Sequence, residues 1–534
     1  MTHFCIPRPL TMLLAIMTLP ANSAAETLDL TSATIGDLNK AIDAGTLSSE
    51  KLVELSLARI AAYDETGPAI NAVLHLNPNA KARARELDDE RARTGRRSPL
   101  HGIPVVIKDN FDTADMPTTA GSFMLKGSVP PDDAFLVRKL RGAGAIILAK
   151  LNMSEFASGG AMNSLDGPTY NPHDPARTPS GSSGGTGAAI AAAYASVGLG
   201  TDTGGSVRGP SSANGIVGLK PTHGLLSRDG IVPLALSFDT AGPMARSVYD
   251  VAVALGVMAG IDVADPATTK SNGQFETDYT QYLEAQALRD ARIGVARDFM
   301  GSDEEVDWIV EAALEAMRDA GAEVVDIKLP EWLMTSRGKF YRAIRYREFR
   351  SQIADYLATT GPDYPKTLEE LVKRSKTLTA RREDGVIPNP GRWQLMLDEV
   401  DSGELTDYEY VAVRNHALPL VRGIIAGLMA SEELDAIVYP TSHIRPQRAD
   451  PDPDPSGAPG GGGSPVTIAN LTGFPDLIVP AGFTGRGLPV SISFLGTAFS
   501  EPRLLALGYA FELRTHARRL PATTPALKGE RINY

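Results

Sequence analysis

The spacing of apolar residues predicts helices near the start of the chain. Leu52, Leu55 and Ile60 recur at helical intervals, and a pair of serines before them can cap a helix, so we expect a helix over residues 48–63. A densely charged segment at 80–93 predicts a second helix with most of its surface in water.

Short apolar runs bounded by glycine predict strands. The run Gly102–Lys108 is rich in β-branched residues and is followed by Asp-Asn, which favours a buried strand that ends at Lys108. A helix–glycine–strand alternation then occurs three times, with helices at 132–140, 303–320 and 408–429 and strands at 145–149, 323–327 and 435–439. This alternation is typical of an α/β fold whose sheet is covered by helices on both faces.

A stretch rich in proline, glycine and aspartate covers residues 445–465. Its composition would also suit an interdomain linker. The chain after it, 466–494, again predicts buried strand, and the remaining C-terminal piece is too short to make a stable domain by itself. We therefore interpret 445–465 as a surface loop within one large domain.

The N-terminus has the layout of a secretory signal peptide over residues 1–25. Arg8 precedes an apolar run at 10–19, and small residues follow Pro20. The run is about half of the ~20 residues that span a bilayer as a helix. The expected cleavage sites follow Ser23, Ala24 and Ala25. An uncleaved anchor or a plain N-terminal helix is the alternative interpretation.

Cleavage would remove Cys5, the one cysteine of the sequence. The mature chain, 26–534, would then have no disulfide, thiolate metal site or cysteine nucleophile. No second segment is long and apolar enough to span a bilayer. We therefore expect a periplasmic or secreted protein with no membrane anchor after processing.

Overall composition narrows the possible partners. Hydrophobic residues make up 43% and charged residues 22% of the chain, as in ordinary globular proteins. The formal net charge of −12 would repel phosphates, so we expect no nucleic-acid partner. The histidines form no metal-ligand spacing such as His-Glu-x-x-His, and we expect neither a metal nor a cofactor.

Two turns rich in glycine and serine are candidates for the chemistry. The first, at 178–187, contains Ser182 and leads into an alanine-rich segment at 188–195 that predicts a helix. The second, at 200–208, contains Ser206. Turns on both sides of one helix would let the two hydroxyls face each other with bare backbone around them.

Three common mechanisms fit these turns poorly. A phosphate-binding P-loop needs Lys followed by Ser or Thr after its last glycine, where this chain has Thr186-Gly187. The segment Gly181–Gly185 satisfies the G-x-S-x-G pattern of a nucleophile elbow, but three prolines precede it where an elbow requires a strand. A histidine triad remains conceivable, although no histidine lies in a distinctive turn.

A lysine base is the fourth possibility. A lysine ammonium cannot accept a proton, so the site must lower its pKa by burial or by cationic neighbours. Lys108, at the end of a predicted apolar strand, is well placed for burial. Taken alone, it could equally be a strand-end lysine that pairs with Asp109.

Together these segments resemble the amidase signature family. The strand and the two turns match the motifs of that family, and so do the segments Gly215–Gly224 and Asp239–Ser247. The resemblance runs from about residue 30 to about residue 518 and implies a single α/β domain around a mixed central sheet. The signal peptide and the segment Phe494–Pro502 are most similar to bacterial peptide amidases.

The resemblance implies a Ser–cis-Ser–Lys triad. Ser206 would attack the amide carbonyl and form an acyl-enzyme. Ser182, in a cis peptide, would relay the proton to a neutral Lys108. The implied oxyanion hole comprises the backbone amides of Thr203, Gly204, Gly205 and Ser206.

The resemblance also implies the surroundings of the triad. Phe156 and Ser182 would bind substrate, and further pocket walls would come from residues 340–410. Asp202 and Arg208 would brace the second turn. Two departures from the family pattern, Ser180 in place of a glycine and Gly209 in place of a bulkier residue, would change the shape of the neighbouring pocket. The resemblance further implies that Ser183 only supports the first turn.

We therefore expect an exported amidase, monomeric or homodimeric, that acts on C-terminal peptide amides or small acyl and aryl amides. An esterase could use the same acyl-enzyme. An amidotransferase subunit that delivers ammonia to a partner is the second class, against which the signal peptide and the acidic charge argue. A catalytically inactive binding protein is the least compatible with the presence of all three triad residues.

Overall fold

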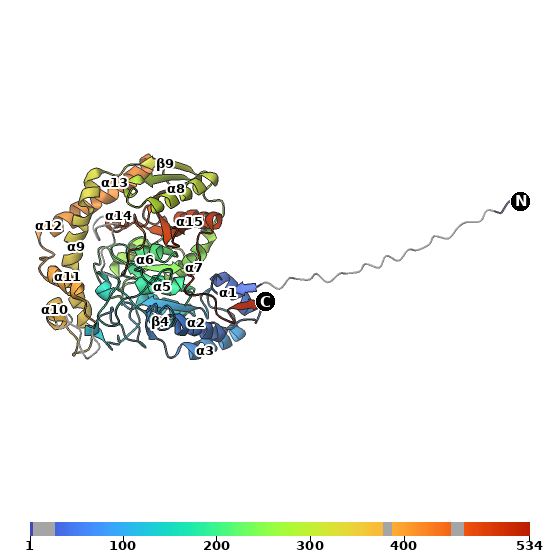
Figure 1. The fold of residues 1–534 in the computed structure, drawn as a ribbon, viewed down its shortest axis with the longest axis horizontal. Coiled ribbons are helices and arrows are strands. Elements are labelled where there is room, and N and C mark those ends of the chain that lie inside the picture. Colours follow the sequence, from blue (N-terminus) through green and yellow to red (C-terminus); the bar gives the residue numbers. More distant parts are fainter. Residues whose placement is uncertain (4–26, 377–386, 450–463, 534) are drawn as a thin grey trace.

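The structure is a computed structural model that describes residues 1–3, 27–376, 387–449 and 464–533. Most of the predicted signal peptide and most of the predicted loop at 445–465 therefore lie outside the described residues. Within the described residues the chain forms one α/β domain (Figure 1). No described helix has both the length and the apolar character needed to cross a membrane.

The centre of the domain is a mixed sheet. In spatial order, its eleven described strands are β2 (Val73–Leu76), β4 (Ile146–Leu151), β3 (Pro104–Lys108), β5 (Val197–Asp202), β7 (Thr240–Ala245), β6 (Val217–Lys220), β11 (Asp476–Phe483), β12 (Pro489–Leu495), β10 (Ala436–Pro440), β8 (Arg292–Ala296) and β9 (Glu323–Ile327). β3 pairs in parallel with β4 and β5, and β8 pairs in parallel with β9 and β10. The other pairings are antiparallel, which confirms the mixed sheet.

Helices surround this sheet (Figure 1). Those before β8 are α1 (Ile35–Asp43), α2 (Ser49–Tyr63), α3 (Ala80–Thr94), α4 (Phe135–Gly142), α5 (Gly184–Ala191), α6 (Arg208–Ala213) and α7 (Val248–Met258). Those after it are α8 (Glu304–Asp319), α9 (Glu331–Ala358), α10 (Leu368–Ser375), α11 (Pro390–Val400), α12 (Tyr408–Ala412), α13 (Leu418–Ser431), α14 (Thr467–Thr472) and α15 (Glu501–Thr515). Helices α9 to α13 form a layer along one side of the molecule, on the left in Figure 1.

Most predicted elements are present, and local signals explain their ends. Ser48 caps α2, because its hydroxyl accepts the Lys51 amide at 3.1 Å. β3 ends at Lys108 and is buried along its whole length, as its apolar run predicted. The predicted helix at 408–429 is continuous in direction but contains a wider turn at Val413–Ala417 between α12 and α13.

Two predicted elements differ from the structure. The alanine-rich helix begins at Gly184 rather than at residue 188, so the glycines form its first turn and Ser183 directly precedes it. The prediction of buried strand throughout 466–494 was wrong in its first part, where α14 lies. That helix ends at Gly473, whose left-handed backbone (φ +74°) provides the usual C-terminal cap, and β11 follows.

A small two-stranded sheet joins the two ends of the described domain. Its strands are β1 (Thr27–Asp29) and β13 (Arg531–Asn533), which pair antiparallel. Arg59 adds a buried ion pair to Glu530 at 2.7 Å, close to this sheet. The start and the end of the domain are therefore fixed beside each other.

Candidate active site

Lys108 is at the centre of a buried polar cluster at the end of β3. Its side chain is 0% exposed, and its Nζ lies 2.7 Å from Ser182 Oγ and 2.7 Å from Thr201 Oγ1. Burial lowers the pKa of Lys108 to about 7, although the carboxylates of Asp202 and Asp239 oppose that shift. A substantial fraction of Lys108 is therefore the neutral amine near neutral pH, the form that can accept a proton.

The two serine turns meet at this cluster. The peptide bond between Gly181 and Ser182 is cis, and the Ser182 side chain is almost completely buried. The Ser182 carbonyl accepts the Ser154 amide at 3.1 Å, and the Ser183 amide donates to the Ser206 carbonyl at 3.2 Å. Backbone hydrogen bonds thus bring the half-buried Ser206 beside the turn of Ser182.

Asp202 stabilises the second turn by accepting hydrogen bonds from its backbone amides. It is the last residue of β5, and its Oδ1 accepts the Gly205 amide at 2.9 Å while its Oδ2 accepts the Val207 amide at 3.0 Å. Arg208 binds the same carboxylate through two hydrogen bonds, Nε to Oδ2 at 3.0 Å and Nη2 to Oδ1 at 2.9 Å. Burial alone would raise the pKa of Asp202, but the charge and hydrogen bonds of Arg208 outweigh it and hold this pKa well below its usual range.

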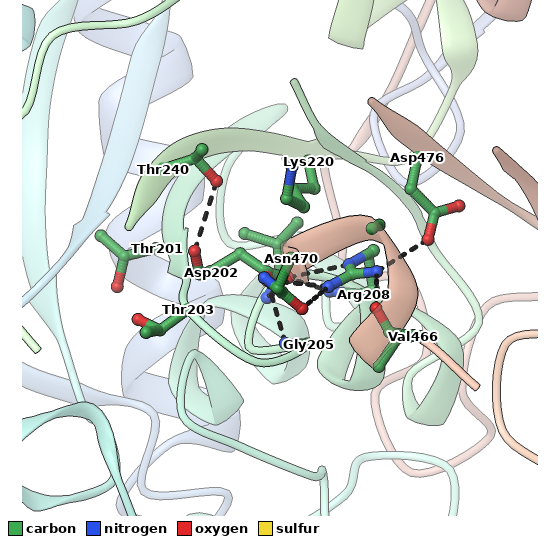
Figure 2. Close-up of polar contacts among 12 residues, drawn as sticks. Thr201, Asp202, Thr203, Gly205, Arg208, Lys220, Thr240, Val466, Asn470 and Asp476 are labelled. Carbon is green, nitrogen blue, oxygen red and sulfur yellow. Dashed lines mark hydrogen bonds and ion pairs between the residues drawn. The ribbon is translucent and has the colours of Figure 1, made fainter. Parts of the chain in front are cut away.

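Arg208 also ties this turn to a distant part of the chain, as Figure 2 shows. Its Nη1 donates to the Val466 carbonyl at 2.6 Å and to Asp476 Oδ2 at 2.8 Å. Its Nη2 donates to Asn470 Oδ1 at 2.6 Å. Because Asn470 Nδ2 donates to Asp202 Oδ1 at 2.8 Å, the carboxylate, the guanidinium and the amide form a closed network.

One amide of the predicted oxyanion hole already has a hydrogen-bond partner within the protein. The Gly205 amide is already bound by Asp202, which leaves the amides of Thr203, Gly204 and Ser206 without a partner among the described residues. Gly205 has φ +117°, and a Cβ atom there would lie 2.5 Å from Val466 Cγ2. Glycine is therefore required at 205 for the shape of the turn, and the three open amides are the donors available to a developing oxyanion.

A cavity of about 270 Å³ opens onto the glycines of both turns. Its walls also include the segment 441–447, parts of α6, and the side chains of Ser464, Val466 and Pro489. No aspartate or glutamate is among the described residues that line it. Arg445, the one arginine among these described lining residues, is bound by Asp303 and Glu305 at 2.5 Å each.

Within the part of the wall that the structure describes, the remaining ionisable residue is His443. Burial lowers its pKa, and the nearby Arg337 lowers it further, so the ring is neutral near pH 7. The described walls therefore offer hydroxyl, amide and neutral ring groups but no free charge. Such a lining suits an uncharged polar ligand.

Phe156 does not line this cavity. Its side chain is 1% exposed and packs against Phe349 of α9, with ring centroids 6.1 Å apart, and beside the guanidinium of Arg392. Its backbone is left-handed (φ +49°), and its amide donates to the Ala120 carbonyl at 2.9 Å. The ring packs against the helical layer, and neither Phe156 nor Ser182 is among the described residues that line the cavity.

Four polar residues of the site were not among those predicted from the sequence. Thr201 accepts hydrogen bonds from Lys108 and from Asn110 Nδ2, the latter at 3.0 Å. Asn470 and Asp476 bind Arg208 from more than 250 residues away in the chain. Asn110 and Thr201 lie in the motifs that identified the site, so their proximity to Lys108 and Ser206 was the available clue.

Comparison with known proteins shows the family to which the chain belongs. A family model described as Amidase matches residues 51–505. A glutamyl-tRNA(Gln) amidotransferase subunit of Halorhodospira halophila is 37% identical over 500 residues, covering 90% of this chain and 96% of that protein.

Solved structures give the same result. The native peptide amidase of Stenotrophomonas maltophilia superposes with a TM-score of 0.83 at 39% identity, covering 92% of this chain and 99% of that one. The corresponding glutamyl-tRNA(Gln) amidotransferase subunit of Thermotoga maritima superposes with a TM-score of 0.70 at 28% identity, covering 93% and 99%. The chain therefore belongs to the amidase signature family and is an amidohydrolase.

Proposed function

We propose that this amidohydrolase is exported and hydrolyses the carboxamide of C-terminal peptide amides, or of small acyl and aryl amides, to a carboxylic acid and ammonia or an amine. The observation that carries the proposal is the contact of 2.7 Å between Lys108 Nζ and Ser182 Oγ in a buried site. With a pKa near 7, this lysine can serve as a base in neutral solution.

In the first half of the reaction, Ser206 Oγ attacks the carbonyl carbon of the amide. The Ser206 proton passes to Ser182 Oγ, and the Ser182 proton passes to Lys108 Nζ. The negative charge that forms on the carbonyl oxygen is bound by the open amides of the second turn. The carbon–nitrogen bond then breaks, and the leaving nitrogen takes a proton back from Lys108 through Ser182.

The second half uses the same groups in the same order. Water attacks the Ser206 ester and loses a proton through Ser182 to Lys108. The ester bond breaks, the proton returns to Ser206 Oγ, and the carboxylic acid leaves. An ester substrate would form the same acyl-enzyme, so esterase activity is compatible with this site.

The lining of the cavity supports a neutral amide as the substrate. A C-terminal peptide amide has no carboxylate at the scissile end, and its nearest amino group is usually acylated. The described walls, with Arg445 neutralised and no acidic side chain, provide no partner for a free ammonium or carboxylate.

The second candidate is an amidotransferase subunit that releases ammonia for a partner. Curated relatives that are subunits of glutamyl-tRNA(Gln) amidotransferases support it, at 35–37% identity over 90–94% of this chain. A free amino-acid amide such as glutamine carries both an ammonium and a carboxylate, which the uncharged lining does not match. Among the solved structures, similarity is higher to the peptide amidase, at 39% identity, than to the amidotransferase subunit, at 28% identity, whereas the curated relatives are amidotransferase subunits.

Ammonia release by the purified chain alone distinguishes the two candidates. We expect turnover of N-acylated peptide amides without any partner protein, and little turnover of free glutamine. A fluorophosphonate should label Ser206 and not Ser182 or Ser183, as peptide mapping would show. Labelling elsewhere, or glutamine turnover that appears only with a partner protein, would exclude the proposal.

Export is a separate part of the proposal and needs its own test. Expression of the full chain in a Gram-negative host, followed by fractionation, should place the protein in the periplasm or medium. N-terminal sequencing should show a start after Ser23, Ala24 or Ala25. An intact Met1 on cytoplasmic protein would contradict export.

A further inference from the structure

Ser180 and Gly209 lie next to each other on the wall of the cavity. The Ser180 backbone has φ +64°, in the left-handed region that glycine adopts freely and other residues rarely adopt. Its amide donates to Thr178 Oγ1 at 3.0 Å, which fixes this conformation. The chain therefore carries a side chain at a position where the backbone favours glycine.

The Ser180 hydroxyl is available to a ligand. The residue is half-buried, and its Oγ has no hydrogen-bond partner among the described residues. A hydroxyl can donate one hydrogen bond and accept others, so it can bind either an amide carbonyl or an amide N–H. In an uncharged cavity this group is one of the few that can orient a polar substrate.

Gly209 provides the space that the Ser180 side chain occupies. A Cβ atom at 209 would lie 2.8 Å from Ser180 Oγ, closer than non-bonded atoms normally approach. The Gly209 amide donates to the Gly205 carbonyl at 2.7 Å, so the backbone at 209 is held in place and cannot move away. A side chain at 209 would displace the Ser180 hydroxyl.

We propose that Ser180 is a specificity-determining residue, which hydrogen bonds a second amide on the acyl side of the scissile carboxamide while Gly209 keeps its hydroxyl in position. A peptide amide or an N-acylated amino-acid amide carries such a second amide, whereas a simple acyl or aryl amide does not. Ser180 and Gly209 thus favour peptide amides and N-acylated amino-acid amides over simple acyl and aryl amides. The inference rests on the proposed amidase function.

The test compares two substrates that share a carboxamide and a phenylmethyl group. N-acetylphenylalaninamide carries the second amide, and 3-phenylpropanamide lacks it. Ser180→Ala should lower kcat/KM for the first substrate by roughly tenfold, the value of one hydrogen bond, mainly through KM. For 3-phenylpropanamide, kcat/KM should stay within about twofold of the wild-type value, which serves as the internal control.

Gly209→Ala gives an independent measurement. It should cause the same selective loss, because its methyl group displaces the hydroxyl. In a Ser180→Gly background, where the space is empty, adding Gly209→Ala should cost no further selectivity, so the two effects are not additive. Ser180→Gly also relieves the left-handed backbone, and fluorophosphonate titration gives the concentration of active sites in every variant.

The outcomes separate the two proposals. If the wild-type protein hydrolyses 3-phenylpropanamide but not N-acetylphenylalaninamide, the peptidic substrate class is wrong and the inference fails with it. If both substrates are hydrolysed and Ser180→Ala lowers both equally or neither, the role of Ser180 is wrong and the amidase function stands. Additive losses in the double variant would contradict the contact with Gly209.

Discussion

Asp202 and Arg208 bind each other through two hydrogen bonds across the turn that carries Ser206. Arg208 also pairs with Asp476, and all three side chains are 0% exposed. The carboxylate accepts amides from inside the turn, while the guanidinium reaches α14 and β11. The position of Ser206, the proposed nucleophile, therefore depends on contacts between segments far apart in the chain.

Replacing this arginine should destabilise the whole domain. Arg208→Met leaves two buried carboxylates without their counter-charge, and the loss of one partner from a buried ion pair costs about 3–5 kcal/mol of the free energy of unfolding. Urea unfolding would measure it. Arg138→Met, which breaks a largely exposed pair with Asp229, is the matched control and should cost less than about 1 kcal/mol. Equal losses in the two variants would contradict the role of the network.

Thr201 should support catalysis without contacting substrate. Thr201→Val removes the acceptor of both Lys108 and Asn110 but keeps the shape of the side chain. We expect kcat to fall by roughly tenfold to a hundredfold with little change in KM, since loss of a proton-transfer group itself costs about 10²–10⁴-fold. Thr201→Ser, which keeps the hydroxyl, should restore most of the activity. A change confined to KM would contradict this role.

The sequence predicted the parts of the site that depend on local pattern. An apolar run that ends in lysine predicted a buried Lys108, and two glycine–serine turns around one helix predicted that Ser182 and Ser206 lie together. These features follow from strand burial and from backbone geometry that glycine allows.

The parts that sequence reasoning missed depend on long-range packing. Nothing near Asn470 or Asp476 indicates that either binds Arg208, because their contact requires β11 to lie beside β6 in the folded sheet. Phe156 follows a strand near the two glycine–serine turns, but its ring packs against Phe349 of α9, which no local pattern could show. The Gly205 amide differs from the three open amides because it donates to Asp202, a contact that no local pattern indicates.

Asp250 should make stability depend on pH. It is 0% exposed, and burial raises its pKa to about 6 even though its Oδ1 accepts the Ile35 amide at 2.7 Å. The folded state thus holds this proton more tightly than the unfolded state, where the pKa is about 3.9. Protonated Asp250 therefore contributes roughly 3 kcal/mol to the free energy of unfolding below about pH 4, and this contribution is lost as the pH rises through 6.

Asp250→Asn should remove this dependence. The amide keeps an acceptor for Ile35 and cannot ionise, so the variant should be more stable than the wild type at pH 8 and similar at pH 4. Urea unfolding across this range would measure it. Asp89→Asn, on the exposed face of α3, should leave the pH curve unchanged. A destabilised Asp250→Asn at pH 8 would show that the charged carboxylate is required instead.

Activity should rise with pH as Lys108 loses its proton. The proposed base is the neutral amine of Lys108, whose pKa is about 7, so kcat/KM should increase tenfold per pH unit below pH 7 and level off above it. The profile of kcat/KM reports the free enzyme, which is the state described here. Lys108→Ala should retain the fold and lose activity at every pH, and a persisting inflection near 7 in that variant would assign the titration to another group.

Removing the charge of Asp239 should move this profile in a defined direction. The Asp239 carboxylate accepts the Thr203 hydroxyl at 2.5 Å and the amides of Leu234 and Ala235, and its charge raises the pKa of Lys108. Asp239→Asn removes the negative charge that raises the pKa of Lys108, so this pKa should fall. The acidic limb of the pH profile of kcat/KM should then shift to lower pH. Asp229→Asn, whose carboxylate pairs with Arg138 at the surface, should leave the limb in place. An unchanged limb, or a shift to higher pH, would show that Lys108 is not the group whose titration controls the rate.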